Sequence, residues 1–247
     1  MDTTIVKGMR VLEALARAGG PVRLSDLSNQ LALQKSNLHR LLRTLLALGY
    51  VEQEESSGRY SATLKIWELG VGVLAVHPVR RAAAPILHQL HGTTGETVNL
   101  TILAGDDIIY LDKLHSPRPM RFLTEPGSRS PAALTAAGRA ILAYHESAPE
   151  IIARTVKLYP GDRKISVRAI ANELSETRSR GYAISESTRT PGIMGIAGPG
   201  LDRSGHAFAS ISITGPKTRL SGVKQDKIVE SLLNACAALS EPVFANH

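Results

Sequence analysis

The sequence predicts an α+β fold with a small helical part at the amino end and a larger mixed part after it. Apolar residues recur at helical spacing in three segments between residues 4 and 48, and two short extended runs follow them. A separate helical run covers residues 64–76 and stops at His77-Pro78. Strands interleaved with helices fill the remainder, which favours helices packed on an antiparallel sheet. The predicted parts are residues 1–63, 64–77 and 78–247.

The amino-terminal part is predicted to hold three helices and a hairpin. The helices cover residues 4–18, 24–31 and 35–48, and the strands cover residues 50–54 and 59–63. Gly19-Gly20-Pro21 end the first helix, and Ser25 is the predicted cap of the second. The residues Glu55-Ser56-Ser57-Gly58 form the hairpin turn. Three helices followed by a two-stranded hairpin make a winged helix-turn-helix.

The second part is predicted to alternate between helices and strands. Helices are expected over about residues 80–91, 132–143, 147–156, 167–181 and 225–239. Strands are expected over residues 98–103, 108–114, 120–123, 193–197 and 207–214. The glycine-rich segment 198–205 lacks the lysine of a phosphate-binding loop and is interpreted as a β-turn, and Gly215-Pro216 as another.

One face of the third predicted helix has the composition of a surface that binds DNA. On a helical wheel of about 100° per residue, the leucines fall within about 80° of Leu38. The opposite side carries Ser36, His39, Arg40, Arg43 and Ala47. No Asp or Glu occurs between Asp26 and Glu52, so a polyanion that approaches this face meets no like charge. A DNA recognition helix requires such a face.

The composition is that of a globular protein. Of the 247 residues, 43% are hydrophobic and 21% are charged, unlike a disordered chain. The net charge is +7, but residues 1–76 hold nine Lys and Arg against seven Asp and Glu. The prediction of DNA binding therefore depends on the local arrangement of charges rather than on their total.

The single cysteine and the hydropathy pattern indicate a location in the cell. Cys236 cannot form an internal disulfide and fits a reducing cytoplasm, and its helical spacing predicts a buried thiol. No segment has the pattern of a signal peptide or approaches the roughly 18 continuous apolar residues of a membrane span. We expect a soluble, cytoplasmic protein.

Six segments of the sequence, taken in order, resemble those of a known protein family. They are SNLHRLLRTLLALGYVE, TGETVNLTIL, LTAAGRAILA, RGYAISES, PGIMGIAGP and ASISITGP. In this order and spacing they resemble the IclR family of bacterial transcription regulators over essentially the whole chain. The resemblance implies a winged helix-turn-helix, a linker helix and a carboxyl-terminal effector domain with GAF/PAS-like topology. It also implies a homodimer or homotetramer on a palindromic double-stranded DNA operator, switched by a small metabolite, often a carboxylate or aromatic acid.

The candidate DNA-binding residues lie on the cationic helix and its neighbours. They are Ser25, Lys35, Ser36, Asn37, His39, Arg40, Arg43 and Arg59. Residues 35–37 open the recognition helix, where free backbone N–H groups can meet phosphates or base edges. Arg43 can pair bidentately with guanine, and Arg59 on the hairpin is expected near a minor groove or the backbone. Two alternatives stay open: a merely solvated helix face, and an internal salt bridge for Arg40.

The candidate effector-binding residues are chosen on two grounds: the resemblance to the family and the geometry of the predicted strands. They are Ala136, Ala137, Ser185, Ile193, Gly195, Ser212 and Thr214. Ser210, Ser212 and Thr214 share one face of a predicted strand, so their hydroxyls could bind a polar ligand, or the face could simply be solvated. The helix beginning near residue 135 offers backbone donors to a carboxylate. Where relatives often have a run of acids, this chain has Ser185-Glu186-Ser187-Thr188.

Catalytic and metal sites are not indicated. His88 and His91 have the spacing of two ligands on one helix, but a zinc site needs two more, and a packed or solvated pair is the simpler interpretation. No serine lies in a Gly-x-Ser-x-Gly elbow. We therefore expect no cofactor and no enzymatic activity. The alternative function is a metabolite-binding protein or an enzyme that uses its amino-terminal domain only to dimerise.

Overall fold

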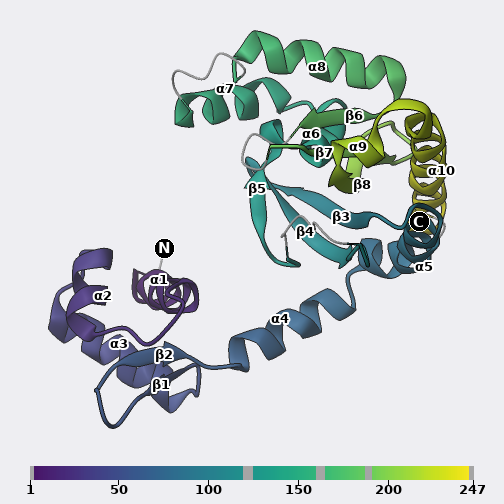
Figure 1. Ribbon diagram of the computed structural model, residues 1–247. Coiled ribbons are helices and arrows are strands. Elements are labelled where there is room, and N and C mark those ends of the chain that lie inside the picture. Colours follow the sequence, from purple (N-terminus) through teal and green to yellow (C-terminus); the bar gives the residue numbers. More distant parts are fainter. Residues whose placement is uncertain (1–2, 119–124, 160–164, 187–190, 245–247) are drawn as a thin grey trace. The chain divides into compact units, whose positions relative to one another are not determined.

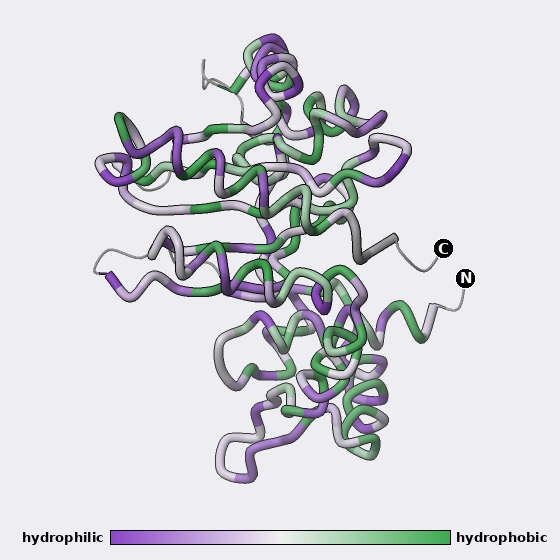
Figure 2. Tube along the Cα trace, turned by 90° about the vertical axis from the view of Figure 1, so that its right-hand side faces the viewer, coloured by the Kyte–Doolittle hydropathy of each residue, from purple (hydrophilic) through white to green (hydrophobic). Residues whose placement is uncertain are grey.

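The computed structural model describes residues 3–118, 125–159, 165–186 and 191–244 of the chain, with side chains up to residue 240. The strand predicted at residues 120–123 lies outside this range. The chain folds into two compact units, Met1–Ala75 and Val76–His247, whose elements are drawn in Figure 1. Hydrophobic and hydrophilic residues alternate along the helices and strands of both units, as Figure 2 shows.

The amino-terminal unit is a winged helix-turn-helix followed by one further helix. Its elements are α1 (Thr3–Arg17), α2 (Leu24–Leu31), α3 (Lys35–Ala47), β1 (Val51–Gln53), β2 (Tyr60–Ala62) and α4 (Lys65–Ala75). Leu27, Leu38 and Leu42 are fully buried in one cluster with residues of α1 and the hairpin. Val22 extends the hairpin through two backbone hydrogen bonds to Tyr60. The predicted winged helix-turn-helix is confirmed.

The turn between α2 and α3 is held by contacts that helical periodicity does not reveal. Ala32 ends α2 in the left-handed conformation, with φ of 52°. The Ser28 hydroxyl donates to the Leu33 carbonyl oxygen at 2.6 Å, and the Leu33 N–H donates back to the Ser28 carbonyl at 3.1 Å. These two bonds fix the angle at which the chain leaves α2 and enters α3.

The carboxyl-terminal unit is built on one six-stranded antiparallel sheet in the order β5-β4-β3-β8-β7-β6. The strands are β3 (Thr97–Ala104), β4 (Asp107–Leu114), β5 (Arg129–Pro131), β6 (Ala183–Glu186), β7 (Ile193–Leu201) and β8 (Ala207–Pro216). The helices are α5 (Pro78–Thr94), α6 (Ala136–Leu142), α7 (Ala148–Leu158), α8 (Val167–Arg180), α9 (Lys217–Leu220) and α10 (Gln225–Phe244), with short 3₁₀ turns at Ala132–Leu134 and Gly222–Lys224. The predicted α+β class is confirmed.

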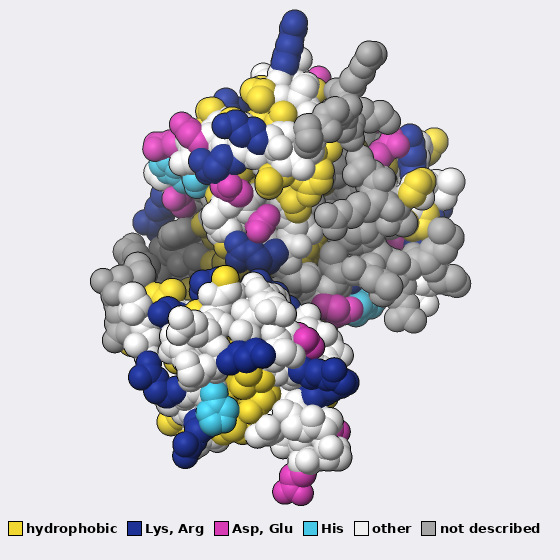
Figure 3. Space-filling model, turned by 90° about the vertical axis from the view of Figure 1, so that its left-hand side faces the viewer, with side chains coloured by type: hydrophobic (Ala, Val, Ile, Leu, Met, Phe, Trp, Pro, Cys, Tyr) yellow, Lys and Arg dark blue, Asp and Glu magenta, His cyan; other side chains and the backbone are white. Residues whose placement is uncertain are grey.

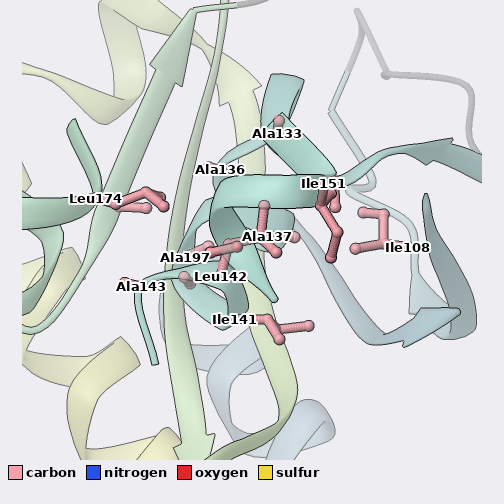
Figure 4. Close-up of a cluster of buried hydrophobic side chains, with 14 of the residues drawn as sticks. Ile108, Ala133, Ala136, Ala137, Ile141, Leu142, Ala143, Ile151, Leu174 and Ala197 are labelled. Atoms are coloured by element: carbon pink, nitrogen blue, oxygen red, sulfur yellow. The ribbon is translucent and has the colours of Figure 1, made fainter. Parts of the chain in front are cut away.

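The two faces of this sheet are covered by different helices. Helices α5 and α10 pack on one face, and α6 packs on the other with α7 and α8 beyond it. A Cβ at Gly198 would lie 2.7 Å from Cys236 Sγ, so β7 and α10 approach each other closely. On the opposite face, Ala136, Ala137 and Ile141 of α6 pack with Ala197 of β7 in one apolar cluster (Figure 4).

Two predicted helix starts are wrong. Arg23 stands at the cap position of α2 and forms no side-chain cap bond, whereas Ser25 lies inside the helix and donates to Asp26 Oδ1 at 3.1 Å. The helix predicted over residues 132–143 is divided, because Thr135 leaves helical geometry at φ −120°. Its hydroxyl accepts a hydrogen bond from the Gly138 N–H at 3.0 Å and so begins α6.

The strand pattern also differs from the prediction at three places. β7 continues through Gly198-Pro199-Gly200 to Leu201, and the turn is confined to residues 202–205. Gly215-Pro216 is likewise part of β8 rather than a turn. The short strands β5 and β6 were not predicted. Along the described residues no helix combines the length and the apolar character that crossing a membrane requires.

Candidate DNA interface and effector site

The outward face of α3 is exposed and free of acidic side chains. Lys35, Ser36, His39, Arg40 and Arg43 are all exposed, and Asn37 is half-buried. The leucines on the other side of the helix are buried, so packing fixes which face turns outward. Figure 3 shows Lys, Arg and His side chains gathered over one face of this unit. The face therefore offers positive charge and hydrogen-bond donors on a rigid helix.

The alternative in which Arg40 forms an internal salt bridge is not what the structure has. Arg40 Nη2 donates to Asn37 Oδ1, one turn earlier on the same helix, at 3.3 Å. Among the described residues Arg43 and Lys35 form no ion pair either. Their charge is therefore not neutralised within the described part of this unit.

The wing adds a second cationic position beside the start of α2. Arg59 precedes β2, and the Glu54 N–H donates to its carbonyl oxygen at 2.8 Å across the hairpin. Arg59 and Arg23 line one shallow hollow, together with Asp26 and the turn after α1. Sequence reasoning missed Arg23, because its position next to Arg59 depends on the Val22–Tyr60 pairing. Ser25, half-buried in α2, lies near this hollow in sequence but does not line it.

Four of the seven candidate effector residues lie on two adjacent rows across the sheet, whereas Ala136 and Ala137 belong to α6 and Ile193 pairs with Pro216 at the start of β7. Ser185 of β6, Gly195 of β7 and Thr214 of β8 stand directly opposite one another. The next row joins Ala197, Ser212, Asn99 and Lys113 on β7, β8, β3 and β4. Directly paired residues point to the same face of a sheet. A Cβ at Gly195 would lie 3.4 Å from the Ala136 Cβ, so this is the face that α6 covers.

Two of the three hydroxyls on this face of β8 are inside the protein, and that of Thr214 is half-buried. Ser210 is fully buried and Ser212 is 4% exposed, so a solvated sheet face is wrong for this strand. Asn99 Nδ2 donates to Ser212 Oγ at 3.3 Å and to Thr214 Oγ1 at 3.4 Å. Asn99 was missed from the sequence, because a single polar residue in an apolar strand gives no signal of its own.

The start of α6 is bonded to the sheet beneath it. The Ala136 N–H donates to Ser185 Oγ at 2.9 Å, and Thr135 takes the Gly138 N–H. Two of the backbone donors expected to meet a carboxylate thus already have partners within the chain. Ala137 and Ile193, at 4% and 3% exposure, contribute apolar packing to this region rather than polar groups.

A buried ammonium lies at the end of the second row. Lys113 is 7% exposed, and burial lowers the pKa of its ammonium while the Glu125 carboxylate partly offsets that effect. Lys113 is paired with Asn99, whose amide bonds the Ser212 and Thr214 hydroxyls, and a lysine, an amide and two hydroxyls on one sheet face suit an anionic ligand. Lys113 was also missed, because a lysine within a predicted strand does not show from sequence alone that it is buried.

One histidine of the pair on α5, His91, forms a local hydrogen bond. His91 Nδ1 is hydrogen-bonded to the Glu96 carbonyl oxygen at 2.8 Å, between the end of α5 and the start of β3. In the parts of the chain that the structure describes, no group of three or more His, Cys, Asp or Glu is placed to hold a metal ion.

Comparison with known proteins places both units in one family. A family model described as the IclR helix-turn-helix domain matches residues 4–55, and one described as bacterial transcriptional regulator IclR C-terminal matches residues 71–241. The chain is 31% identical over 223 residues to the probable transcriptional regulator SauR of Cupriavidus necator, covering 89% of this chain and 88% of that protein. It is also 31% identical over 241 residues to the transcriptional regulator KdgR of Escherichia coli, covering 96% and 91%.

Solved structures show the same fold. A transcriptional regulator of this type from Alicyclobacillus acidocaldarius matches with a TM-score of 0.82 and 25% identity, covering 98% of this chain and 99% of that one. A homologue from Microbacterium hydrocarbonoxydans, crystallised with 4-hydroxybenzoate, matches with a TM-score of 0.78 and 21% identity, covering 99% and 100%. With family models covering both units, this chain belongs to the IclR family of bacterial transcriptional regulators.

Proposed function

We propose that this chain regulates a metabolic operon by binding a palindromic operator as a homo-oligomer, under the control of a small carboxylate or aromatic acid. Residues 1–63 read the DNA, residues 64–77 link the parts, and residues 78–247 hold the effector. The protein acts in the cytoplasm, where the chromosome is, and performs no catalysis. The observation that carries the proposal is the exposed, acid-free face of α3.

The amino end of α3 is the part of the helix that enters the major groove. The backbone N–H groups near Lys35 and the positive end of the helix dipole favour a phosphate there. Arg40 and Arg43 are then directed at base edges, where a bidentate pair with guanine discriminates by about 1–3 kcal/mol. Arg59, with Arg23 beside it, contacts the backbone from the wing.

A second copy of the chain covers the exposed apolar side chains of α4. No residue of α4 is buried, and Trp67, Leu69 and Val73 are 65%, 55% and 70% exposed. Exposed apolar surface of this kind marks a protein interface. A two-fold partner is the occupant we favour, because a palindromic operator requires two recognition helices about one helical turn of DNA apart.

The effector is held between α6 and the sheet face beneath it. The buried Lys113 ammonium supplies a positive charge, and Asn99, Ser212 and Thr214 supply hydrogen-bonding groups in register beside it. A carboxylate is the ligand that such a set favours. The homologue that binds 4-hydroxybenzoate, which is an aromatic acid, shares this fold.

Fluorescence anisotropy with the full-length protein tests the proposal. Labelled fragments from upstream of the neighbouring operon are titrated at several salt concentrations, with and without candidate carboxylates. Specific binding should weaken steeply as salt rises, with log K linear in log salt. Absence of binding to every fragment at low ionic strength would contradict the proposal, and turnover of a metabolite without DNA would favour an enzyme.

A further inference from the structure

A polar cavity lies on the face of the carboxyl-terminal unit opposite to α6. It has a volume of about 490 Å³ and lies between the end of α5 and the start of α10. Its charged lining consists of one acid, Glu96, and four cations, Arg118, Arg219, Lys224 and Lys227. The hydroxyls that line it belong to Thr93, Thr94 and Ser231, and each donates to a helix carbonyl. The unused donors in the cavity are therefore cationic.

The carboxylate of Glu96, at the base of the cavity, is already paired with two arginines. The Glu96 side chain is 2% exposed, and Arg118 Nη1 donates to its Oε1 at 2.7 Å. Arg219 donates to both carboxylate oxygens, from Nε at 2.6 Å and from Nη2 at 2.8 Å. A Cβ at residue 215 would lie 2.7 Å from Glu96 Oε2, so glycine there leaves room for the carboxylate. One negative charge is thus bound by two guanidinium groups.

The remaining charge in the cavity is positive. Lys224 and Lys227 are exposed and form no ion pair with any residue that the structure describes. Asp226 and Glu230, their acidic neighbours on α10, do not line the cavity. Two lysines and two arginines against a single carboxylate leave a net charge of +3.

The helix ends do not cancel this charge. The amino end of α10 places positive dipole potential beside Lys224 and Lys227. The carbonyl end of α5 would oppose an anion, but Arg118 Nη1 also donates to the Thr94 carbonyl oxygen at 3.4 Å. The field inside the cavity therefore favours an anion.

We infer that this cavity binds a small, multiply charged anion, either a phosphate-bearing metabolite or a polycarboxylate. A volume of about 490 Å³ lies within the range of small-molecule sites. The site is separate from the one beneath α6: Gly198 faces α10 and Gly195 faces α6, on opposite sides of β7. The protein would thus receive two different small-molecule signals through the same sheet.

Calorimetric titration of the full-length protein tests the inference. Because the titration contains no DNA, its result does not depend on whether the protein binds an operator. Inorganic phosphate, pyrophosphate and citrate are titrated at constant ionic strength, with sodium chloride as the reference. The test variant is the double substitution Lys224→Glu and Lys227→Glu, which leaves the buried Glu96 network intact. Lys157→Glu, an exposed lysine of α7, is the matched control.

At least one of the three anions should bind, and the double variant should weaken its binding by about tenfold or more, because two attractions become repulsions. The Lys157→Glu protein should bind as the unaltered protein does. Stronger binding of the phosphates or of citrate identifies the source of the anion. No binding above the chloride reference, or equal affinity in the double variant, would overturn the inference.

Discussion

The Lys65 ammonium donates a hydrogen bond to the Leu48 carbonyl oxygen at 2.7 Å and so ties the first residue of α4 to the end of α3. A cation at this place also interacts favourably with the negative end of the α3 dipole. Lys65 Nζ lies 4.8 Å from the centroid of the Tyr50 ring, and the Thr63 hydroxyl donates to the Gly49 carbonyl at 2.7 Å. The helix proposed to read DNA and the helix proposed to pair with a second copy are therefore mechanically connected.

Replacing Lys65 by Met should weaken that connection without unfolding the unit. Loss of this exposed hydrogen bond costs at most about 1 kcal/mol, so operator affinity should decrease by no more than several-fold. Lys65→Arg keeps a cation near the carbonyl and should retain most of the affinity. Anisotropy titrations of both variants measure the difference, and equal affinity of Lys65→Met and the unaltered protein would show that the contact plays no part in DNA binding.

Arg43→Ala should reduce operator binding while the melting temperature stays the same. The side chain is exposed and forms no ion pair among the described residues, so its removal disturbs no packing. A lost guanine contact should cost about 1–3 kcal/mol and relax sequence preference at one base pair. Titration against operators altered base by base locates that position. Lys157→Ala serves as the control for the loss of one positive charge. Unchanged operator affinity in the Arg43→Ala protein would show that Arg43 is not part of the DNA interface.

Ser212→Ala should raise the dissociation constant of the effector once a carboxylate ligand is found. The Ser212 hydroxyl accepts from Asn99 on the face beneath α6, and its loss costs about 1 kcal/mol per hydrogen bond. Calorimetry measures the change. Lys224→Glu, in the separate cationic cavity, should leave this dissociation constant the same. An unchanged dissociation constant in the Ser212→Ala protein would exclude Ser212 from the effector site.

Gly198→Ala should destabilise the carboxyl-terminal unit by about 1–3 kcal/mol, because the added methyl group overpacks the contact with α10. The Cβ would lie 2.7 Å from Cys236 Sγ. Cys236→Ala removes that sulfur, so the double variant should lose less stability than the two single variants together. Urea unfolding of the four proteins gives the coupling energy, and strict additivity would show that the two residues do not compete for this space.

The Cys236 thiol should be unreactive in the native protein. Burial raises its pKa from 9.0 to about 12, so the thiolate is scarce at neutral pH. Because the folded pKa is the higher one, this group's stabilisation is complete below pH 9 and is lost between pH 9 and 12. A thiol reagent should label the chain at pH 8 only in denaturant, and rapid labelling of the native protein would contradict the buried position.

The amino-terminal elements were predictable because their signals are local. The leucine spacing in α3 fixes both the helix and its buried side, and the exposed cationic face follows from it. The strands expected over residues 98–103 and 108–114 were predicted for the same reason, since each is an apolar run, and the structure has β3 and β4 there. The exposed candidates for DNA contact could therefore be named without a structure.

The elements that could not be predicted depend on distant packing. β5 and β6 have three and four residues, which is too short for an alternation to be visible. Gly198 and Gly200 resembled a turn, but they are small because α10 lies against them. Asn99 and Ser212 meet across 113 positions of sequence, so nothing in either neighbourhood indicates their pairing. The cationic cavity likewise joins segments that only the fold brings together.

The pairing of β3 with β8 has a consequence for synthesis on the ribosome. Thr97 is opposite Thr214, so the centre of the sheet stays open until nearly the whole chain has emerged. The winged helix-turn-helix closes its own core within the first 75 residues and can fold much earlier. A nascent or prematurely terminated chain would thus carry a finished DNA reader long before it could sense a metabolite.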